Sequence, residues 1–211
     1  MRTDQLIEQL ALDREPPARP RLRLAFALAM GWLVALAALF VVLGSPLTMV
    51  EHTGAAPFAV KFGYALALTA LSVAAAFAAG QPGRELTRRV TIIPLPVAVI
   101  SGVAMIELAS TDPSAWQGLF FGTTYANCIL SVVLASVPVL VAIFWAYRQL
   151  APTHLALSGF LIGLGAGAAG AVAFTFYCHE TSAAFLLAAY TPAMLIPAAA
   201  GALLSRPLLR W

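Results

Sequence analysis

Three side chains that can bind metals or react with oxidants stand next to one another in the segment FTFYCHETSAAF, residues 174–185. These are Cys178, His179 and Glu180, and the chain contains only one other cysteine, Cys128. Thiolate and imidazole groups bind soft and borderline metals, and two thiols can also be oxidised to a disulfide. The residue types therefore predict thiol oxidation or metal capture, provided that the fold brings the second cysteine close.

The composition indicates where this chemistry takes place. Hydrophobic residues make up 61% of the 211 residues, charged residues only 10%, and the mean hydropathy is +0.89. A soluble domain needs about a quarter of charged residues. The sequence therefore predicts an all-α integral membrane protein. Six stretches approach the roughly 20 apolar residues that cross a bilayer, namely 24–43, 59–79, 90–108, 119–147, 155–177 and 183–204.

The charged residues predict the orientation of this six-helix bundle. Lys61 is the one basic residue expected on one side, and eleven arginines are expected on the other: Arg2, Arg14, Arg19, Arg21, Arg23, Arg84, Arg88, Arg89, Arg148, Arg206 and Arg210. Basic residues are retained in the cytoplasm, so we expect both termini there. The pI of about 9.2 is then explained by topology and anionic lipid, without direct nucleic-acid binding.

Two parts of the chain follow from this arrangement. Residues 1–23 form a cytoplasmic segment with no apolar core or cleavage site of a signal peptide, so we expect it to be retained. Residues 24–211 form the transmembrane domain.

The same topology places both cysteines near the outer, non-cytoplasmic face. Cys178 is expected at the outer end of the fifth helix or in the very short loop after it, and Cys128 two or three turns into the fourth helix from its outer start. A short connection, RQLAPTH, makes these two helices antiparallel neighbours. We therefore expect the two sulfurs to approach each other in an oxidising compartment.

Two interpretations of the cysteine segment remain open from spacing alone. A metal site would draw on Cys128, Cys178, His179 and His52, but adjacent helical residues diverge by about 100° and would converge only on an irregular backbone. The simpler interpretation is that the cysteines are inert apolar side chains, while His179 and Glu180 cap a helix end.

The N-terminal head predicts a short amphipathic helix. Thr3 can cap it, Asp4 lies in its first turn, and one apolar face is formed by Leu6, Ile7, Leu10 and Ala11. About ten residues do not form a stable helix alone in water. The segment from Asp4 to Asp13 carries three acids and no base, which favours a protein partner over an anionic lipid surface.

Further patterns indicate how the helices pack. Gly159, Gly163 and Gly167 are spaced by four and predict a close helix contact, with packing inside one bundle favoured over dimerisation. Prolines interrupt the predicted spans at Pro94, Pro96, Pro138, Pro192 and Pro197, and Pro16, Pro17 and Pro20 predict an extended tether after the head. Lys61 and Glu107 are expected near outer helix ends, which does not indicate an ion pathway.

The head MRTDQLIEQLALD, the six spans, YANCILS around Cys128 and YCHETS around Cys178 resemble the NrsF family. These are bacterial membrane anti-sigma factors, negative regulators of SigF-type extracytoplasmic-function sigma factors. The resemblance implies that the head holds a cytoplasmic sigma factor inactive at the inner membrane, through Asp4, Leu6, Ile7, Leu10 and Ala11. It also implies that Cys128 and Cys178, with His179 and Glu180, sense heavy metals or oxidants from the periplasm.

The resemblance further implies a regulator and not an enzyme, with no resident cofactor apart from a metal held transiently at the cysteines. A change at the cysteines would alter the packing of helices four and five and release the sigma factor inside. The alternative is a membrane thiol oxidoreductase or small transporter that uses the same cysteines. Such an enzyme is expected to carry a CxxC pair, which the sequence lacks.

Overall fold

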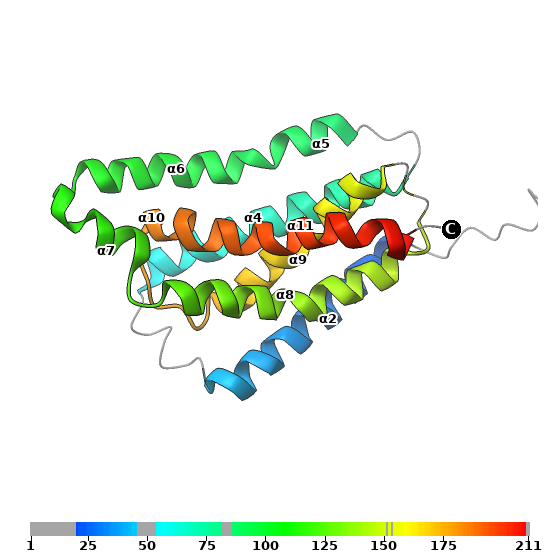
Figure 1. Cartoon of the computed structure of the whole chain (residues 1–211), viewed down its shortest axis with the longest axis horizontal. Coiled ribbons are helices and arrows are strands. Elements are labelled where there is room, and N and C mark those ends of the chain that lie inside the picture. Colours follow the sequence, from blue (N-terminus) through cyan, green and yellow to red (C-terminus); the bar gives the residue numbers. More distant parts are fainter. Residues whose placement is uncertain (1–19, 46–53, 82–85, 151, 153, 210–211) are drawn as a thin grey trace, which may run out of the picture.

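The computed structural model describes residues 20–45, 54–81, 86–150, 152 and 154–209, and within them the chain is helical without strands (Figure 1). The longer helices are α2 (Pro20–Leu43), α4 (Ala55–Ala79), α5 (Leu86–Ile92), α6 (Pro94–Ala109), α8 (Tyr125–Tyr147), α9 (Leu155–Phe174) and α11 (Thr191–Leu209). Short turns of helix complete the fold: η1 (Pro113–Ala115), α7 (Trp116–Phe121), α10 (Ala183–Phe185) and the π-helical η2 (Leu186–Tyr190). The predicted head and His52 lie outside the described residues.

Six helical segments are long and apolar enough to cross a membrane, as the composition predicts. They are Pro20–Leu43, Ala55–Ala79, Leu86–Ala109, Pro113–Tyr147, Leu155–Phe174 and Ala183–Leu208. Their directions alternate, so that α2 begins at the end of the bundle where the C-terminus lies (Figure 1). The loop after α9 lies at the opposite end, with the start of α8 and α10.

Helix α9 forms the centre of the bundle. From Ser158 to Phe174 every residue except Phe160 is buried. Much of this stretch is glycine and alanine, and small side chains let the backbones of neighbouring helices come close. α9 therefore packs against α4, α8 and α11 at once, which a helix of large side chains could not do at these distances.

Three glycines of α9 contact α11 directly, as their spacing predicts. A Cβ atom added at Gly159 would lie 2.2 Å from the carbonyl oxygen of Gly201, and one at Gly163 only 2.1 Å from that of Pro197. At Gly167 the distance to the carbonyl oxygen of Met194 would be 2.8 Å. The glycine stripe therefore serves packing inside one bundle.

Two helices are attached more loosely. The span containing α5 and α6 is only 11% buried, and Ile100 and Ala104 are the buried residues of α6 (Figure 1). The span formed by α2 is 22% buried. α2 lies along α8, where a Cβ at Gly31 would come within 2.7 Å of the Cα of Val139.

Several predicted helix bounds require correction. The predicted continuous helix 119–147 is wrong, because Gly122 adopts φ +49 and separates α7 from α8. Pro20 does not belong to the extended tether but is the first residue of α2, a position where proline's missing N–H costs no helical bond. The third span divides before Pro94, and the fifth helix ends at Phe174.

The proline in the last span shows how the bundle tolerates such an interruption. Pro192 has no N–H to donate to the carbonyl of Ala188, four residues earlier. The hydroxyl of Tyr125 on α8 donates to that carbonyl oxygen at 3.0 Å instead. The neighbouring Leu186 carbonyl accepts from Thr191 Oγ1 at 3.2 Å within the π-helical turn. The Tyr125 side chain therefore replaces the backbone bond that Pro192 removes.

We predict that Gly163→Ala destabilises the protein by about 1–3 kcal/mol, because the added methyl group would overlap the Pro197 carbonyl. Gly102→Ala is the matched control, since no atom lies within 4 Å of a Cβ at that helical glycine. Thermal unfolding in detergent should show a lower melting temperature for the first variant only. Equal melting temperatures would contradict this close contact between α9 and α11.

Candidate functional site

The two cysteines meet at the end of the bundle opposite the C-terminus. Their sulfur atoms lie 3.8 Å apart, and both residues are buried and unbridged. Cys128 belongs to the first turn of α8, and not two or three turns inside the fourth helix as predicted, because that helix begins anew at Tyr125. The prediction that neighbouring helices bring the sulfurs together is confirmed.

Cys178, His179 and Glu180 lie on an irregular segment between α9 and α10, but they do not converge on one point. The Cys178 side chain is buried against Cys128, whereas His179 is exposed and Glu180 is half-buried. The Glu180 carboxylate turns towards the loop before α8, where Oε1 accepts from the Thr123 amide at 3.0 Å and from Thr124 Oγ1 at 3.3 Å. The three residues therefore have separate surroundings. Cys178 contacts Cys128, the imidazole of His179 is exposed, and Glu180 binds the loop before α8.

Gly122 is required for this contact between Glu180 and the loop before α8. Its φ of +49 lies in the region that favours glycine, and a Cβ there would lie only 2.5 Å from Glu180 Oε1. The break between α7 and α8 therefore makes room for the carboxylate.

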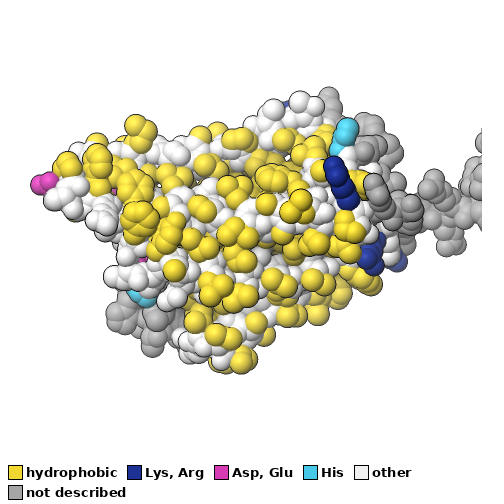
Figure 2. All heavy atoms as spheres, in the orientation of Figure 1, with side chains coloured by type: hydrophobic (Ala, Val, Ile, Leu, Met, Phe, Trp, Pro, Cys, Tyr) yellow, Lys and Arg dark blue, Asp and Glu magenta, His cyan; other side chains and the backbone are white. Residues whose placement is uncertain are grey.

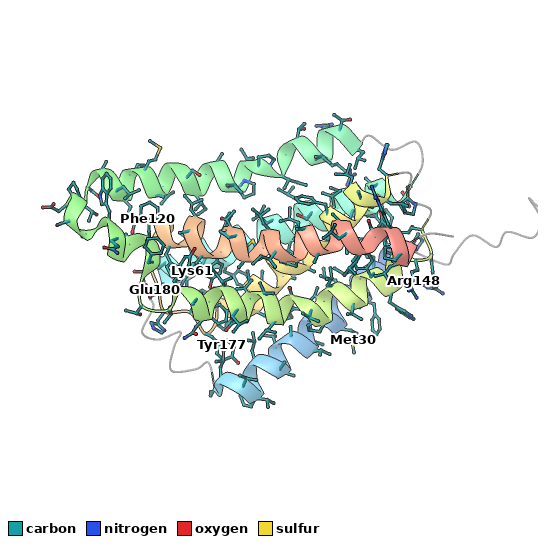
Figure 3. The ribbon with its side chains drawn as sticks, in the orientation of Figure 1. Met30, Lys61, Phe120, Arg148, Tyr177 and Glu180 are labelled. Atoms are coloured by element: carbon teal, nitrogen blue, oxygen red, sulfur yellow. The ribbon has the colours of Figure 1, made fainter. Side chains whose placement is uncertain are left out.

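Lys61 reaches the same segment from α4. Its Nζ donates to the carbonyl oxygens of Cys178 and Glu180, each at 2.6 Å, and the side chain is 1% exposed. Figure 3 shows Lys61 and Glu180 at the same end of the bundle, with Arg148 at the other. A buried ammonium is costly unless its donors are satisfied, so this pair of bonds holds the segment firmly on α4.

Glu107 of α6 fixes the far end of the segment. Its Oε2 accepts from the amides of Ala183 at 2.8 Å and Ala184 at 3.2 Å, and from Ser182 Oγ at 3.0 Å. Ser182 Oγ also accepts from the amides of Ala184 and Phe185. The first amides of a helix lack partners within the helix, so these oxygens cap the last span.

The surroundings favour the thiolate form of Cys178. The hydrogen bond from the Cys128 thiol lowers the pKa of Cys178 to about 6, against the opposing effect of burial. The Lys61 ammonium and the Tyr190 hydroxyl contribute to this lowering of the pKa. A thiolate is the form that attacks oxidants and binds soft metals, so this site is prepared for either.

A small cavity gives access to the pair. It measures about 200 Å³ and is lined by Leu43, Ser45, Thr124, Asn127, Cys128, Ser131, Phe174, Tyr177, Cys178 and His179. Several of these side chains are polar, and the volume suits a small molecule or ion. Leu43 is the last residue of α2 and Ser45 lies just after it, so the first helix borders the cysteine site.

The described residues contain no group of three or more His, Cys, Asp or Glu side chains that could hold a metal ion. Cys128 and Cys178 are the two predicted metal ligands that the structure brings together, while His179 is exposed beside their cavity. The fourth candidate, His52, lies outside the described residues. The described geometry is therefore that of a dithiol pair.

Sequence reasoning missed the roles of Lys61 and Glu107. Both lie near helix ends, as predicted, but their contacts with the cysteine segment depend on which helices become neighbours. The signal that could have found Lys61 was its isolation, as the one basic residue on its side among eleven arginines on the other.

The family model of NrsF, described as the negative regulator of sigma F, matches residues 10–211. The chain belongs to this family. It is 37% identical over 216 residues to the probable anti-sigma-F factor NrsF of Azospira oryzae, with 100% of each chain covered. It is 34% identical over 220 residues to the anti-sigma-F factor NrsF of Caulobacter vibrioides, again over 100% of each chain. No solved structure matches the chain. The predicted NrsF resemblance is therefore confirmed, and the named role of the NrsF relatives is regulatory.

We predict that mild oxidation of this NrsF chain joins Cys128 to Cys178 within one molecule, because their sulfurs are already 3.8 Å apart. Peptide mapping under non-reducing conditions should recover a linked pair of peptides, and maleimide labelling should fall for both thiols. Cys128→Ser supplies the control, since it leaves Cys178 without its neighbour. Disulfide-linked dimers in place of the internal link would contradict the site.

Proposed function

We propose that this NrsF protein is an anti-sigma factor of the inner membrane that sequesters an extracytoplasmic-function sigma factor of the SigF type. On this proposal it releases the sigma factor when Cys128 and Cys178 react with a heavy metal or oxidant from the periplasm. The family membership supports the regulatory part, and the observation that carries the sensing part is the 3.8 Å separation of the two sulfurs. The proposed partners are the sigma factor and membrane lipid.

The surface chemistry supports insertion with both termini in the cytoplasm. Hydrophobic side chains cover the length of the face shown in Figure 2, whereas Lys and Arg appear at the end near the C-terminus and Asp and Glu at the other. Exposed large hydrophobic residues such as Phe26, Val41 and Ile106 suit contact with lipid tails. The basic end matches the cytoplasmic face by the retention of arginine.

The orientation can be tested with reporter fusions. We expect fusions after Asp112 and Glu180 to report the periplasm, and fusions after Arg148 and Trp211 to report the cytoplasm, because the arginine-rich end stays inside. A periplasmic reading at Trp211 would contradict the orientation and the proposed exposure of the cysteines to periplasmic signals.

The sensing step on this proposal is a movement of the segment around Cys178. A disulfide has an S–S distance of about 2.05 Å, so the sulfurs must approach by roughly 1.8 Å. A soft metal bound between the two thiolates would instead fix the positions of the sulfurs through two metal–sulfur bonds. Either event acts on a segment that Lys61 and Glu180 hold in one position.

Helix α2 is the element that we propose to carry the change inward. Its outer end borders the cysteine cavity through Leu43, and its inner end at Pro20 is joined to the head, residues 1–13, by the short segment 14–19. α2 also lies along α8, which carries Cys128 at its outer end, and Arg23 donates to Gln149 just beyond the inner end of α8. A helix that borders the cysteine cavity at one end, and has no other described element between itself and the N-terminal segment at the other, suits transmission.

The head is the proposed sigma-binding element, through Asp4, Leu6, Ile7, Leu10 and Ala11, all outside the described residues. We expect Leu6→Asp combined with Leu10→Asp to abolish co-purification of the sigma factor, because both changes place charge on the apolar face that fills a partner's groove. Gln5→Ala combined with Gln9→Ala is the matched control on the polar face and should keep binding. The measurement is sigma factor recovered with the detergent-solubilised full chain.

Release can be measured in the same assay. Oxidant or metal treatment should lower the recovered sigma factor for the natural chain, and Cys128→Ser should abolish this response because serine forms neither a disulfide nor a comparable metal bond. Unchanged recovery with the head variant would overturn the sigma-binding role. A full response in a Cys128→Ser, Cys178→Ser double variant would overturn the sensing role.

The alternative of a membrane thiol oxidoreductase or small transporter uses the same cysteines. Family membership favours the regulator, since the NrsF relatives carry the names of anti-sigma-F factors. The buried position of both thiols also suits a sensor of small agents better than an enzyme that must dock a protein disulfide.

A further inference from the structure

Lys61 interacts more directly with Cys178 than with Cys128. Its ammonium is bonded to the Cys178 carbonyl itself, and it bonds the Glu180 carbonyl two residues later. Burial removes its water, and both of these hydrogen bonds go to the segment that carries Cys178. Interactions between charges strengthen where water is excluded. A negative charge on Cys178 therefore gains more from Lys61 than one on Cys128.

Cys128 has a different environment. It lies in the first turn of α8, where its sulfur lies 3.5 Å from Thr124 Oγ1 and 3.8 Å from the sulfur of Cys178. The Cys128 thiol can donate a hydrogen bond to a Cys178 thiolate and itself stay protonated. The two sulfurs thus occupy unequal positions, one supported by a buried cation and the other acting as its hydrogen-bond donor.

We infer that Lys61 is a positioning residue that makes Cys178 the attacking thiolate of the pair and leaves Cys128 as the resolving thiol. The inference rests on the proposed sensing function and assigns an order to its chemistry. It applies to soft electrophiles small enough for the cavity of about 200 Å³ that both cysteines line.

A hydroperoxide illustrates the balanced reaction. The Cys178 thiolate attacks the terminal peroxide oxygen, an S–O bond forms, the O–O bond breaks, and the leaving alkoxide takes a proton from water. Cys128 sulfur then attacks the Cys178 sulfenic acid, an S–S bond forms, the S–O bond breaks, and hydroxide leaves with the Cys128 proton as water. The two thiols lose two electrons and the peroxide gains them.

The ionisable groups that act on Cys178 come from three neighbouring elements and its own segment. They are Lys61 from α4, Cys128 from α8, Tyr190 from η2 and Glu180 beyond His179. Among these groups Lys61 is the basic side chain, and it hydrogen-bonds to the carbonyl of Cys178 itself. Removing the Lys61 charge should therefore move the reactivity of Cys178 to higher pH.

The first test uses the natural full-length chain in detergent. Brief iodoacetamide treatment between pH 5 and pH 9, followed by peptide mapping, measures the labelling rate of each cysteine. We expect Cys178 to be labelled before Cys128, with a half-maximal rate near pH 6, the pH at which its thiolate forms. Faster labelling of Cys128, or labelling of Cys178 only above about pH 8, the range of an ordinary thiol, would overturn the inference.

The second test removes the cation. Lys61→Met should slow Cys178 labelling roughly tenfold at pH 6.5 and have little effect at pH 9, where an ordinary thiol is also largely ionised. Lys61→Arg keeps the charge and should retain most of the rate at pH 6.5. Glu107→Gln is the structural control, because it loosens the same segment at Ala183 without removing the cation, and its pH midpoint should stay in place.

Equal pH profiles for the natural chain and the folded Lys61→Met variant would overturn the role of Lys61. A shift of the same size in Glu107→Gln would also overturn it, because loosening alone would then explain the effect. The sigma-factor recovery assay on the same samples separates this from the proposed function. A chain that never binds a sigma factor contradicts the function, while its labelling order still tests Lys61.

Discussion

The buried ammonium of Lys61 is the interaction on which the arrangement of the site depends. In an apolar bundle a cation needs polar partners at close range, and the carbonyls of Cys178 and Glu180 supply them at 2.6 Å. These bonds fix the segment after α9 against α4. With the segment held there, Cys178 can only face the start of α8, where Cys128 meets it.

The two carboxylates at this end of the bundle serve the same purpose through backbone amides. Glu180 binds the loop before α8, and Glu107 caps the last span from α6. Glu107 places an acidic oxygen on amides that open a helix, where negative charge is favoured, whereas Glu180 accepts from one amide of the loop before α8. Three charged side chains from separate parts of the chain thus tie α4, α6, α8 and the last span to one short segment.

The centre of the bundle and its edge contribute differently to the proposed switch. α9 is locked by glycine contacts with α11, where no side-chain atom could be added without displacement. α2 lies at the edge, with most of its span exposed, yet it borders the cysteine cavity and leads into the head. On the proposed function, a closely packed centre and a more exposed edge would let a movement of the segment near Cys178 act on α2 without unfolding the bundle, since close-packed interiors resist gradual deformation.

Much of the fold could be predicted from the sequence alone, because it follows from composition and from the periodicity of apolar and small residues. Apolar runs of helical length predict the six spans, and the placement of arginines predicts the orientation. Gly159, Gly163 and Gly167 predict a close helix contact. The Cys-His-Glu triplet with a second cysteine 50 residues earlier marked both the site and the family. These are local patterns, which the order of residues carries directly.

Tertiary structure decided what these residues do to one another. Adjacent positions suggested that Cys178, His179 and Glu180 act together, but the irregular segment sends the thiol inward, the imidazole outward and the carboxylate to Thr123. The helix is interrupted at Gly122, so Cys128 lies in the first turn of α8. A Cβ atom at Gly122 would overlap the Glu180 carboxylate. Lys61 lies more than a hundred residues before Cys178, so only the packing of α4 against α9 could bring its ammonium to that carbonyl and give the two thiols unequal surroundings.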